Sequence, residues 1–272
     1  MFILSRNELP KTPAALAVAL EEAVREFASG TKPTIIVRGT GLHSLDEIVV
    51  DLSGAVIDPQ HRPVMSKLSR TEPAISVRKL SVSAAPVKVL GSELAFGFAG
   101  SNVQLNQATA PDGKVLLTFH QADSGEVRVA IARKELERLI AKIATSAAAR
   151  QGVTIDNVQV DLTSRAPRTL EAKVTVSVRK LFFRTKLRLS GTVAVTDDLN
   201  ATVSGLRCEG DGTLAALVCA AITPQFSRME ERAFPLSALP IGEIRVNELA
   251  IAVDDKQIVV EARFGSQSAM PS

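Results

Sequence analysis

Alternating apolar and polar residues dominate the chain and predict a protein built mainly of β-strands. In the clearest example, every second residue from Leu170 to Val178 is apolar, and the residues between them are polar or charged. Successive side chains of a strand point to opposite faces, so this pattern is typical of an antiparallel strand with one buried face. A second alternating run extends from Phe183 to Val195, with its apolar positions shifted in phase.

The change of phase between these two runs has two interpretations. A hairpin with an even loop would produce it, but no Gly, Pro, Asn or Asp lies between Leu170 and Ser190 to form a tight turn. We therefore expect one long, bent strand with a β-bulge at Phe182-Phe183. By contrast, Asp197–Asn200 and Asp254–Lys256 contain residues typical of hairpin turns.

Three segments show the period and the end signals of amphipathic helices. The first follows Thr12 and Pro13, which suit an N-cap and the first helical position, and it ends before Gly30. The second runs from about Arg133 to Arg150. The third begins after Asp211-Gly212 and meets Pro224, which we expect to kink or end it. Helices set among alternating strands indicate the α+β class.

A weak internal repeat adds a detail to the predicted strands. Residues 75–82, 153–160 and 244–251 share apolar spacings of two, three and two. A step of three inside a pattern of two is what a β-bulge produces, so we expect a bulge in each copy. No shift in composition separates two parts of the chain. We therefore expect one elongated domain over residues 1–264, followed by a disordered tail at 265–272.

Composition places the chain among globular proteins. Hydrophobic residues make up 46% of its 272 residues and charged residues 22%, which excludes wholesale disorder. The apolar run at the N-terminus is too short for a signal peptide, and the longest apolar window, Leu214–Ile222, is about half the length that crosses a bilayer. We expect a cytoplasmic protein, with peripheral membrane association as an option.

Metal, cofactor and nucleotide sites are not expected. The two cysteines, Cys208 and Cys219, are interpreted as buried free thiols in preference to a disulfide. The three histidines are scattered, without acidic or thiol neighbours at the spacing of metal ligands. The segment Gly39–Ser44 resembles a phosphate-binding turn only faintly, because the following residues are typical of a strand and not of a helix. We interpret it as a plain turn.

Positive charge is concentrated in one stretch of the chain. Between Arg165 and Arg188 there are eight cationic residues against Glu171, a charge of +7 in a chain whose net charge is +3. Five of these cations share the polar face of the alternating pattern, so they should form an exposed basic stripe. These five residues are Lys173, Arg179, Arg184, Lys186 and Arg188. The stripe suits anionic headgroups or, alternatively, is a solvated strand face that discourages edge pairing.

The C-terminal part of the chain resembles a known family. The similarity covers Val153 to Phe264, including the turn Phe234-Pro235-Leu236-Ser237-Ala238-Leu239-Pro240 and the following Gly242–Val246, and Ala130–Ile143 is similar to the entry into its helix. In these segments the chain resembles the LmeA-like phospholipid-binding family, which is similar in plan to tubular lipid-binding proteins. The resemblance implies a long, curved antiparallel sheet wrapped around helices, with an apolar groove for acyl chains.

From the resemblance and the basic stripe we expect a non-enzymatic protein that binds phospholipid or another acyl-chain lipid. No nucleic-acid partner is expected, because the chain has no Trp or Tyr to stack on bases. The expected apolar lining consists of Phe96, Phe98, Phe182, Phe183, Leu187, Leu189, Leu217 and Phe226. The same residues could instead fill an ordinary core. In that case the chain would be a structural or adaptor module that docks on a protein or membrane surface.

Overall fold

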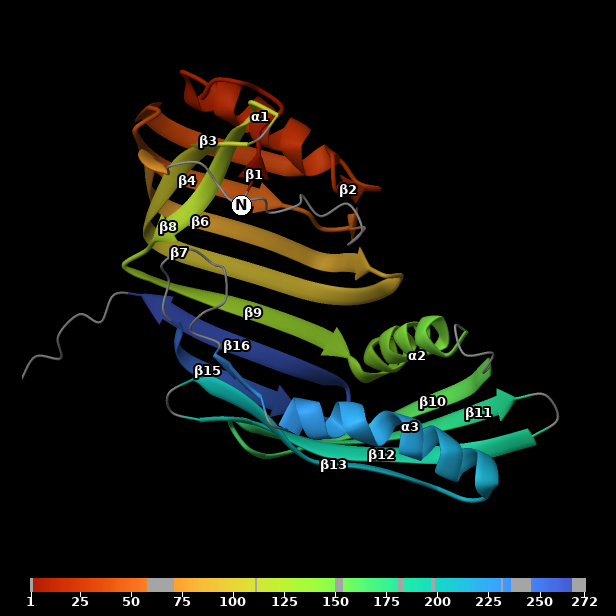
Figure 1. Ribbon diagram of the computed structural model, residues 1–272. Helices are drawn as coiled ribbons and strands as arrows, with labels where there is room; N and C mark the ends of the chain where they lie inside the picture. Colours follow the sequence, from red (N-terminus) through yellow and green to blue (C-terminus); the bar gives the residue numbers. More distant parts are fainter. Residues whose placement is uncertain are drawn as a thin grey trace, which may run out of the picture. The chain divides into compact units, whose positions relative to one another are not determined.

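The computed structural model of the protein confirms the α+β class and shows two β-sheets with three helices. Contacts divide the chain into two compact units, which are described one at a time (Figure 1). Unit 1 comprises Met1–Val129, Ser237–Glu248 and Glu261–Ser272, and unit 2 comprises Ala130–Leu236 and Leu249–Val260. The described residues are 2–57, 71–110, 112–149, 154–180, 183–196, 199–230, 232–235 and 246–265. The single domain over 1–264 stays a prediction.

Unit 1 contains one helix and most of an eleven-stranded sheet. Its main path runs β15-β16-β9-β7-β6-β4-β3, and the ends of β9, β15 and β16 belong to unit 2. The elements are β1 (Phe2–Ile3), α1 (Pro13–Arg25), β2 (Ala28–Ser29), β3 (Thr34–Gly41), β4 (Ser44–Asp51), β5 (Val56–Ile57), β6 (Glu72–Val89), β7 (Ser92–Thr109), β8 (Val115–Gln121), β9 (Ser124–Ala132), β15 (Val246–Val253) and β16 (Gln257–Gly265).

The sheet of unit 1 is mixed rather than purely antiparallel. Strand β4 pairs with β6 in parallel, while β3 with β4 and β6 with β7 are antiparallel. Parallel neighbours need a long crossover, and the twenty residues 52–71 between β4 and β6 supply one. The predicted turn at Gly39–Ser44 is confirmed as the β3–β4 hairpin.

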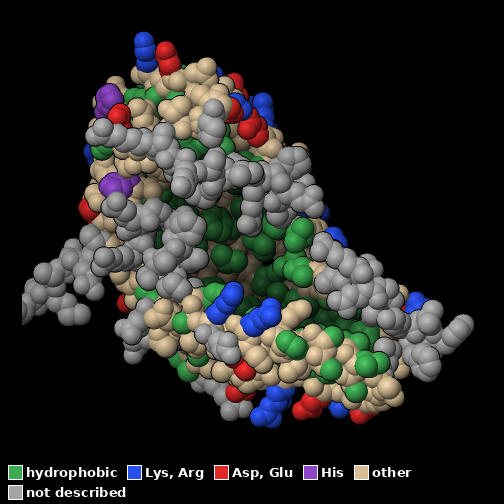
Figure 2. Space-filling model, viewed as in Figure 1, with side chains coloured by type: hydrophobic (Ala, Val, Ile, Leu, Met, Phe, Trp, Pro, Cys, Tyr) green, Lys and Arg blue, Asp and Glu red, His purple; other side chains and the backbone are tan. Residues whose placement is uncertain are grey.

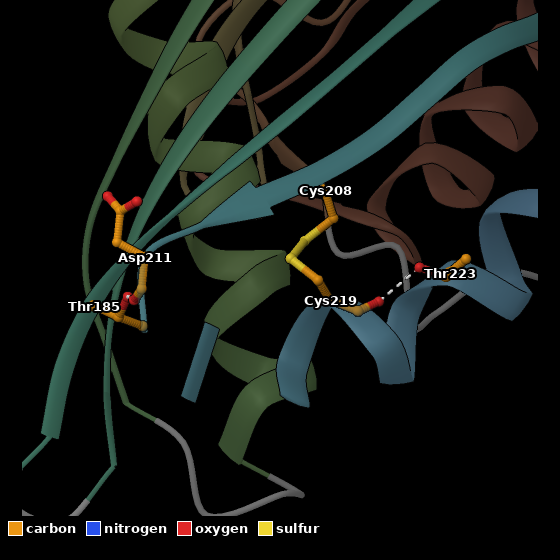
Figure 3. The surroundings of a disulfide bond; sticks show 5 residues. All are labelled: Thr185, Cys208, Asp211, Cys219 and Thr223. Carbon is orange, nitrogen blue, oxygen red and sulfur yellow. Dashed lines mark hydrogen bonds between the residues drawn. A yellow bond between two sulfur atoms is a disulfide. The ribbon is translucent and has the colours of Figure 1, made fainter. Parts of the chain in front are cut away.

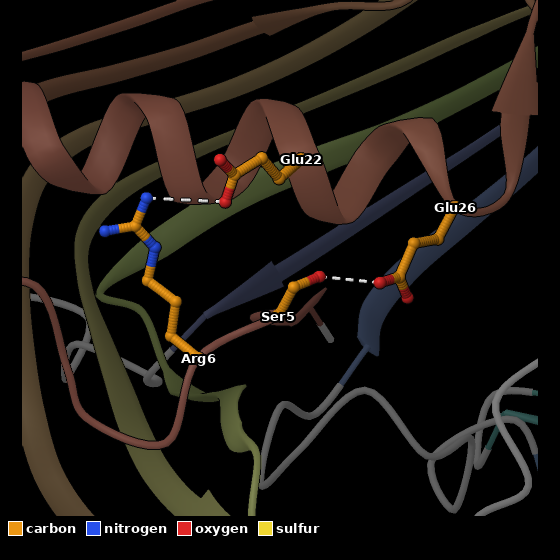
Figure 4. A network of polar contacts seen from close by, with 4 residues as sticks. All are labelled: Ser5, Arg6, Glu22 and Glu26. Atoms are coloured by element: carbon orange, nitrogen blue, oxygen red, sulfur yellow. Dashed lines mark hydrogen bonds and ion pairs between the residues drawn. The ribbon is translucent and has the colours of Figure 1, made fainter.

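Helix α1 forms where its caps and apolar stripe predict it. The Thr12 hydroxyl accepts a hydrogen bond from the Ala15 amide at 3.2 Å, and Pro13 occupies the first turn. The apolar side of the helix packs against the sheet through residues that are at most 3% exposed: Leu16, Ala19, Leu20, Ala23 and Val24. On the other side, Glu22 and Glu26 bind Arg6 and Ser5 of the preceding segment, as Figure 4 shows.

Unit 2 consists of a five-stranded antiparallel sheet, two helices and the ends of three strands of the first sheet. The order of the sheet is β10-β11-β12-β13-β14. Its elements are α2 (Arg133–Ala149), β10 (Thr154–Ala166), β11 (Thr169–Lys180), β12 (Phe183–Val195), β13 (Asn200–Gly210), α3 (Thr213–Glu230) and β14 (Ala233–Pro235). All three predicted helices are therefore confirmed, and Pro224 lies inside α3 without ending it.

The expectation of one bent strand across Phe182-Phe183 is wrong, because β11 and β12 form an antiparallel hairpin. Lys180 pairs with Phe183 and Arg179 with Arg184, so only residues 181–182, which lie outside the described part of the chain, connect the strands. This register places Val174 opposite Leu189 and Val176 opposite Leu187. The matching of apolar faces decides the register even though no turn residue marks the hairpin in the sequence.

The predicted bulges have mixed outcomes. In β10 the register against β11 shifts between Ile155 and Asn157, which confirms a bulge at Asp156. In β6 the register against β7 shifts at 73/75 and 84/87, outside residues 75–82, so the bulge expected in the first copy of the repeat is wrong. Residues 244 and 245 of the third copy lie outside the described residues. The hairpins predicted at Asp197–Asn200 and Asp254–Lys256 are confirmed by the β12–β13 and β15–β16 connections.

Cys208 and Cys219 form a disulfide, so the expectation of two free thiols is wrong. Their Cα atoms are 5.3 Å apart, and the bond joins α3 to β13 (Figure 3). Cys208 pairs with Leu189 and therefore lies on the apolar face of the sheet, under the helix. The sequence pattern predicts Cys208 in a strand and Cys219 on the apolar face of a helix, but it does not show that the strand and the helix pack against each other.

The disulfide should contribute strongly to the stability of unit 2. It closes a loop with a sequence separation of 11, for which the chain-entropy model gives about 3 kcal/mol. We expect Cys208→Ser/Cys219→Ser to lower the free energy of unfolding in urea by about 2–3 kcal/mol. Ellman's reagent should detect no thiol in the unreduced, denatured protein. Two titratable thiols in protein prepared under oxidising conditions would contradict the bond.

A polar network in unit 1 fixes the turn that follows β4. The Asp51 carboxylate accepts hydrogen bonds from the Ser53 hydroxyl at 2.6 Å and the Ser53 amide at 2.9 Å. The Ser53 hydroxyl in turn accepts one from the Ala85 amide of β6 at 3.0 Å. The hydroxyl and amide of Ser53 hold the pKa of Asp51 below its usual value, with a smaller contribution from Ser83.

This lowered pKa predicts a pH dependence of stability. A carboxylate that is stabilised in the folded state contributes above its unfolded pKa of about 3.9, and the contribution is lost as pH falls through the lower folded pKa. In Asp51→Asn the amide oxygen can accept the same hydrogen bonds without titrating. We therefore expect the urea midpoint of the variant to fall less than that of the wild type between pH 5 and pH 3. Parallel pH curves for the two proteins would contradict this role of Asp51.

Candidate functional site

The sheet of unit 2 has one apolar face, and its two helices lie over the edges of that face. Strand register places the apolar residues of β10, β11 and β12 on the same side. Helix α2 packs on β10, and α3 packs on β13 and the adjoining part of β12. Ala215 of α3, which is fully buried, contacts the same cluster as Val178 and Leu187. Each helix thus covers a flank of the face.

Between the helices, part of the apolar face stays half-exposed. We call this part the open strip. It lies on the first half of β11 and the paired part of β12, where Val174 lies opposite Leu189 and Leu170 opposite Val193. The members of the open strip are Leu170, Ala172, Val174, Leu189 and Val193. An apolar sheet face of this length is normally covered, so the open strip is a place where an apolar ligand could lie.

The expected lining residues of unit 2 do not all belong to the open strip. Leu189 does, but Leu187 is 3% exposed and lies in the core. Phe226 is half-buried on the side of α3 that faces the sheet, whereas Leu217 is 66% exposed on the opposite side of that helix. Phe182 lies outside the described residues, and only the backbone of Phe183 is described.

Phe96 and Phe98 belong to unit 1, so the expected lining is divided between the two units. They pair with Ala84 and Val82 on one apolar face of the β6–β7 ladder. Toward β4 this face is buried, with Val50 fully covered, and toward β7 it is half-exposed. Figure 2 shows hydrophobic side chains gathered in a hollow over β6, β7 and β9.

Two aromatic residues of this region were missed by sequence reasoning. The ring of Phe98 is 5.6 Å from that of Phe119, in edge-to-face orientation, and stacks on that of Phe264 at 5.5 Å. Phe119 lies on β8, the strand that follows β7 and pairs with it, whereas Phe264 lies at the end of β16, far from Phe98 in the sequence. The position of β16 in the sheet brings Phe264 to the other two rings, and no local spacing could have indicated this contact.

All five residues of the predicted basic stripe are exposed on the polar face of the unit 2 sheet. Arg179 lies directly opposite Arg184, and Lys186 lies opposite Ser177 on the same face. This face is the reverse of the one that carries the open strip, because side chains alternate along β11 and β12. The sheet itself therefore separates the basic stripe from the open strip.

Acidic residues of neighbouring strands reduce the charge of the stripe. Asp156, which the bulge in β10 places beside the hairpin, lies 3.5 Å from Arg179 and 4.0 Å from Arg184. Arg188 lies 4.0 Å from Asp211. Asp161 pairs with Lys173, and Glu209 with Arg188, across the ladders. The +7 of the linear segment is thus largely balanced in space, which favours a solvated strand face.

The described residues carry several carboxylates with lowered pKa values and a cleft with charged side chains. They contain no group of three His, Cys, Asp or Glu side chains that could hold a metal ion. The lowered pKa values of Asp51, Asp112 and Asp254 all arise from hydrogen bonds within turns. One cleft of about 450 Å³ in unit 1 lies over β6, β7 and β9, and none of these three aspartates lines it. Its lining combines small residues with the charged Glu47, Lys79, Glu126 and Arg263.

Two further findings complete the description of the site. Among the described residues, no helix has both the length and the apolar composition needed to cross a bilayer. No family model, no curated protein and no solved structure matches the chain. Function must therefore be inferred from the geometry of the two apolar faces.

A substitution at Gly125 tests the packing around the rings of Phe98, Phe119 and Phe264. A Cβ at this position of β9 would collide with the ring of Phe264 and with the Ala99 carbonyl oxygen. Overpacking of this kind costs about 1–3 kcal/mol, so we expect Gly125→Ala to lower the free energy of unfolding by that amount. A Cβ at Gly97 of β7 would meet nothing within 4 Å, so Gly97→Ala is the matched control. Equal stability of the two variants in urea would contradict the packing.

Proposed function

We propose that the protein binds acyl-chain lipids, phospholipid among them, and that it does so without catalysing a reaction. The observation that carries this proposal is the open strip of unit 2. Its members are all apolar side chains, so they offer a ligand dispersion contacts and removal from water but no hydrogen bonds. A hydrocarbon chain is the ligand that gains most from such a surface, about 0.8 kcal/mol for each CH₂ that it buries.

The position of the helices supports a lipid that lies along the strip. The α2 side of the strip carries exposed cations, Lys134 and Arg138, on the same side of the sheet as the apolar residues. A phosphate attached to a chain on the strip would have these cations on its own side of the sheet. It could not reach the basic stripe, because the sheet lies between them. The half-exposed face around Phe96 and Phe98 offers a second apolar surface of the same chemistry in unit 1.

Two other considerations bear on the proposal. The resemblance of Val153–Phe264 to the LmeA-like phospholipid-binding family supports the same ligand class. The Cys208–Cys219 bond supports an oxidising compartment, because disulfides rarely persist in a reducing cytosol. We therefore favour such a compartment over the expected cytoplasmic location, and peripheral association with a membrane remains part of the proposal.

Binding of a fluorescent fatty acid tests the function. We expect 11-(dansylamino)undecanoic acid to bind the wild type with increased emission. Ala172→Phe fills the open strip with a ring and should weaken that binding at least fivefold. Thr175→Phe is the matched control, because Thr175 lies on the opposite face of the same strand and should bind the probe as the wild type does. Native mass spectrometry of freshly purified protein should show bound lipid.

The opposite results would favour the alternative function. Absence of co-purified lipid together with absence of probe binding would indicate a filled core, as in a structural or adaptor module. Equal loss of binding in Ala172→Phe and Thr175→Phe would show that the probe does not occupy the open strip.

A further inference from the structure

The solvent side of α3 is apolar and exposed, and no described residue of unit 2 covers it. Leu217, Ala220, Ala221 and Pro224 are all exposed and follow one another at the spacing of one helix side. Leu217 is 66% exposed, which is unusual for a large aliphatic side chain. No charged residue occurs from Thr213 to Ser227. Figure 2 shows hydrophobic side chains on the exposed side of this helix. We call these four residues the α3 strip.

Cations border the α3 strip on the same side of the sheet. Arg228 follows Pro224 by one turn, in line with the strip, and is exposed. On α2, exposed Lys134, Arg138 and Lys142 are spaced four residues apart and form a row, in which Arg138 also contacts Glu135. Ile143, beside this row, is 55% exposed. Both helices pack on the apolar face of the unit 2 sheet, so these groups share the side of the open strip.

Exposed apolar side chains together with lysine and arginine are what an anionic bilayer surface binds. The apolar side of an interfacial helix enters the boundary of the acyl chains, while cations nearby attract the headgroups. The reverse face of the sheet lacks exposed apolar side chains, because its exposed residues are polar. Its cations are balanced by Asp156, Asp161 and Glu209. Charge complementarity and the α3 strip therefore favour the helix side as the surface that meets an anionic bilayer.

We infer that the α3 strip and the cationic row of α2 dock unit 2 on the surface of an anionic phospholipid bilayer. This inference rests on the proposed function and names the partner from which the open strip would receive its lipid. It also assigns membrane contact to the side of the sheet opposite the basic stripe. A lipid leaving the bilayer would meet the open strip without having to cross the sheet.

Flotation with vesicles tests the inference by comparing two faces. The vesicles contain phosphatidylcholine and phosphatidylglycerol at 3:1, or phosphatidylcholine alone. We expect Lys134→Gln/Arg138→Gln/Lys142→Gln to weaken binding to the anionic vesicles at least fivefold. The matched control, Arg184→Gln/Lys186→Gln/Arg188→Gln, removes the same charge from the reverse face and should change binding less than twofold. Binding should fall with added salt.

A second pair of variants tests the apolar contribution to vesicle binding. Leu217→Gln should weaken binding to anionic vesicles about threefold or more, and Val18→Gln, an exposed residue of α1 in unit 1, should leave it unchanged. Both positions are exposed, so circular dichroism and the urea midpoint should match those of the wild type. The fatty-acid probe, which needs no vesicle, should bind Leu217→Gln normally. If the wild type does not bind the probe, the proposed function is contradicted, while vesicle flotation still tests separately whether unit 2 docks on a bilayer.

Three outcomes would overturn the inference. The first is a wild type that does not float with anionic vesicles. The second is a larger loss in the reverse-face triple variant than in the α2 variant, which would return membrane contact to the basic stripe. The third is light scattering that shows self-association abolished by Leu217→Gln while vesicle binding is unchanged, which would make the α3 strip an interface between copies of the chain.

Discussion

The structure of unit 2 depends on the register of the β11–β12 hairpin. Val174 opposite Leu189 and Val176 opposite Leu187 put the leucine and valine side chains of the two strands on one face. A slip of one residue would exchange that face for the cationic one, so the register is strongly determined. The positions of both helices follow from it. Each helix packs apolar residues on the same face, the ends of β15 and β16 add Ile251, Val253 and Ile258 to the same cluster, and the open strip is the part of that face that stays half-exposed.

Local signals predicted the elements that local chemistry determines. The Thr12 cap, Pro13 and the stripe from Leu16 to Val24 predicted α1 because capping and amphipathicity act within one or two turns. The spacing of three residues between Ile155 and Val158 predicted the bulge of β10, because a bulge changes the alternation of side chains only where it occurs. The hairpin was missed because its turn carries no Gly, Asn or Asp, and long-range matching of apolar faces stabilises it instead.

Features that depend on contacts between distant segments could not be predicted in this way. Phe264 meets Phe98 and Phe119 only because β16, near the end of the chain, lies beside β9 in the same sheet as β7 and β8. The disulfide required knowledge that α3 folds back over β13. Of the eight expected lining residues, only Leu189 lies in the open strip, because apolar periodicity identifies the buried face of a strand but not the part of it that helices leave uncovered.

The charge distribution shows most clearly that local sequence does not determine which residues meet in space. A run of +7 along the chain suggested a strongly basic surface, yet pairing across the sheet brings Asp156, Asp161 and Glu209 among those cations. Electrostatic attraction depends on the charge within about 10 Å, not on neighbours in the sequence. On the helix side, the cations of α2 lie beside apolar side chains that remain in water. Burying those side chains would add a hydrophobic contribution that the polar sheet face cannot supply, which is why we propose the helix side, with its less basic sequence, as the membrane-docking surface.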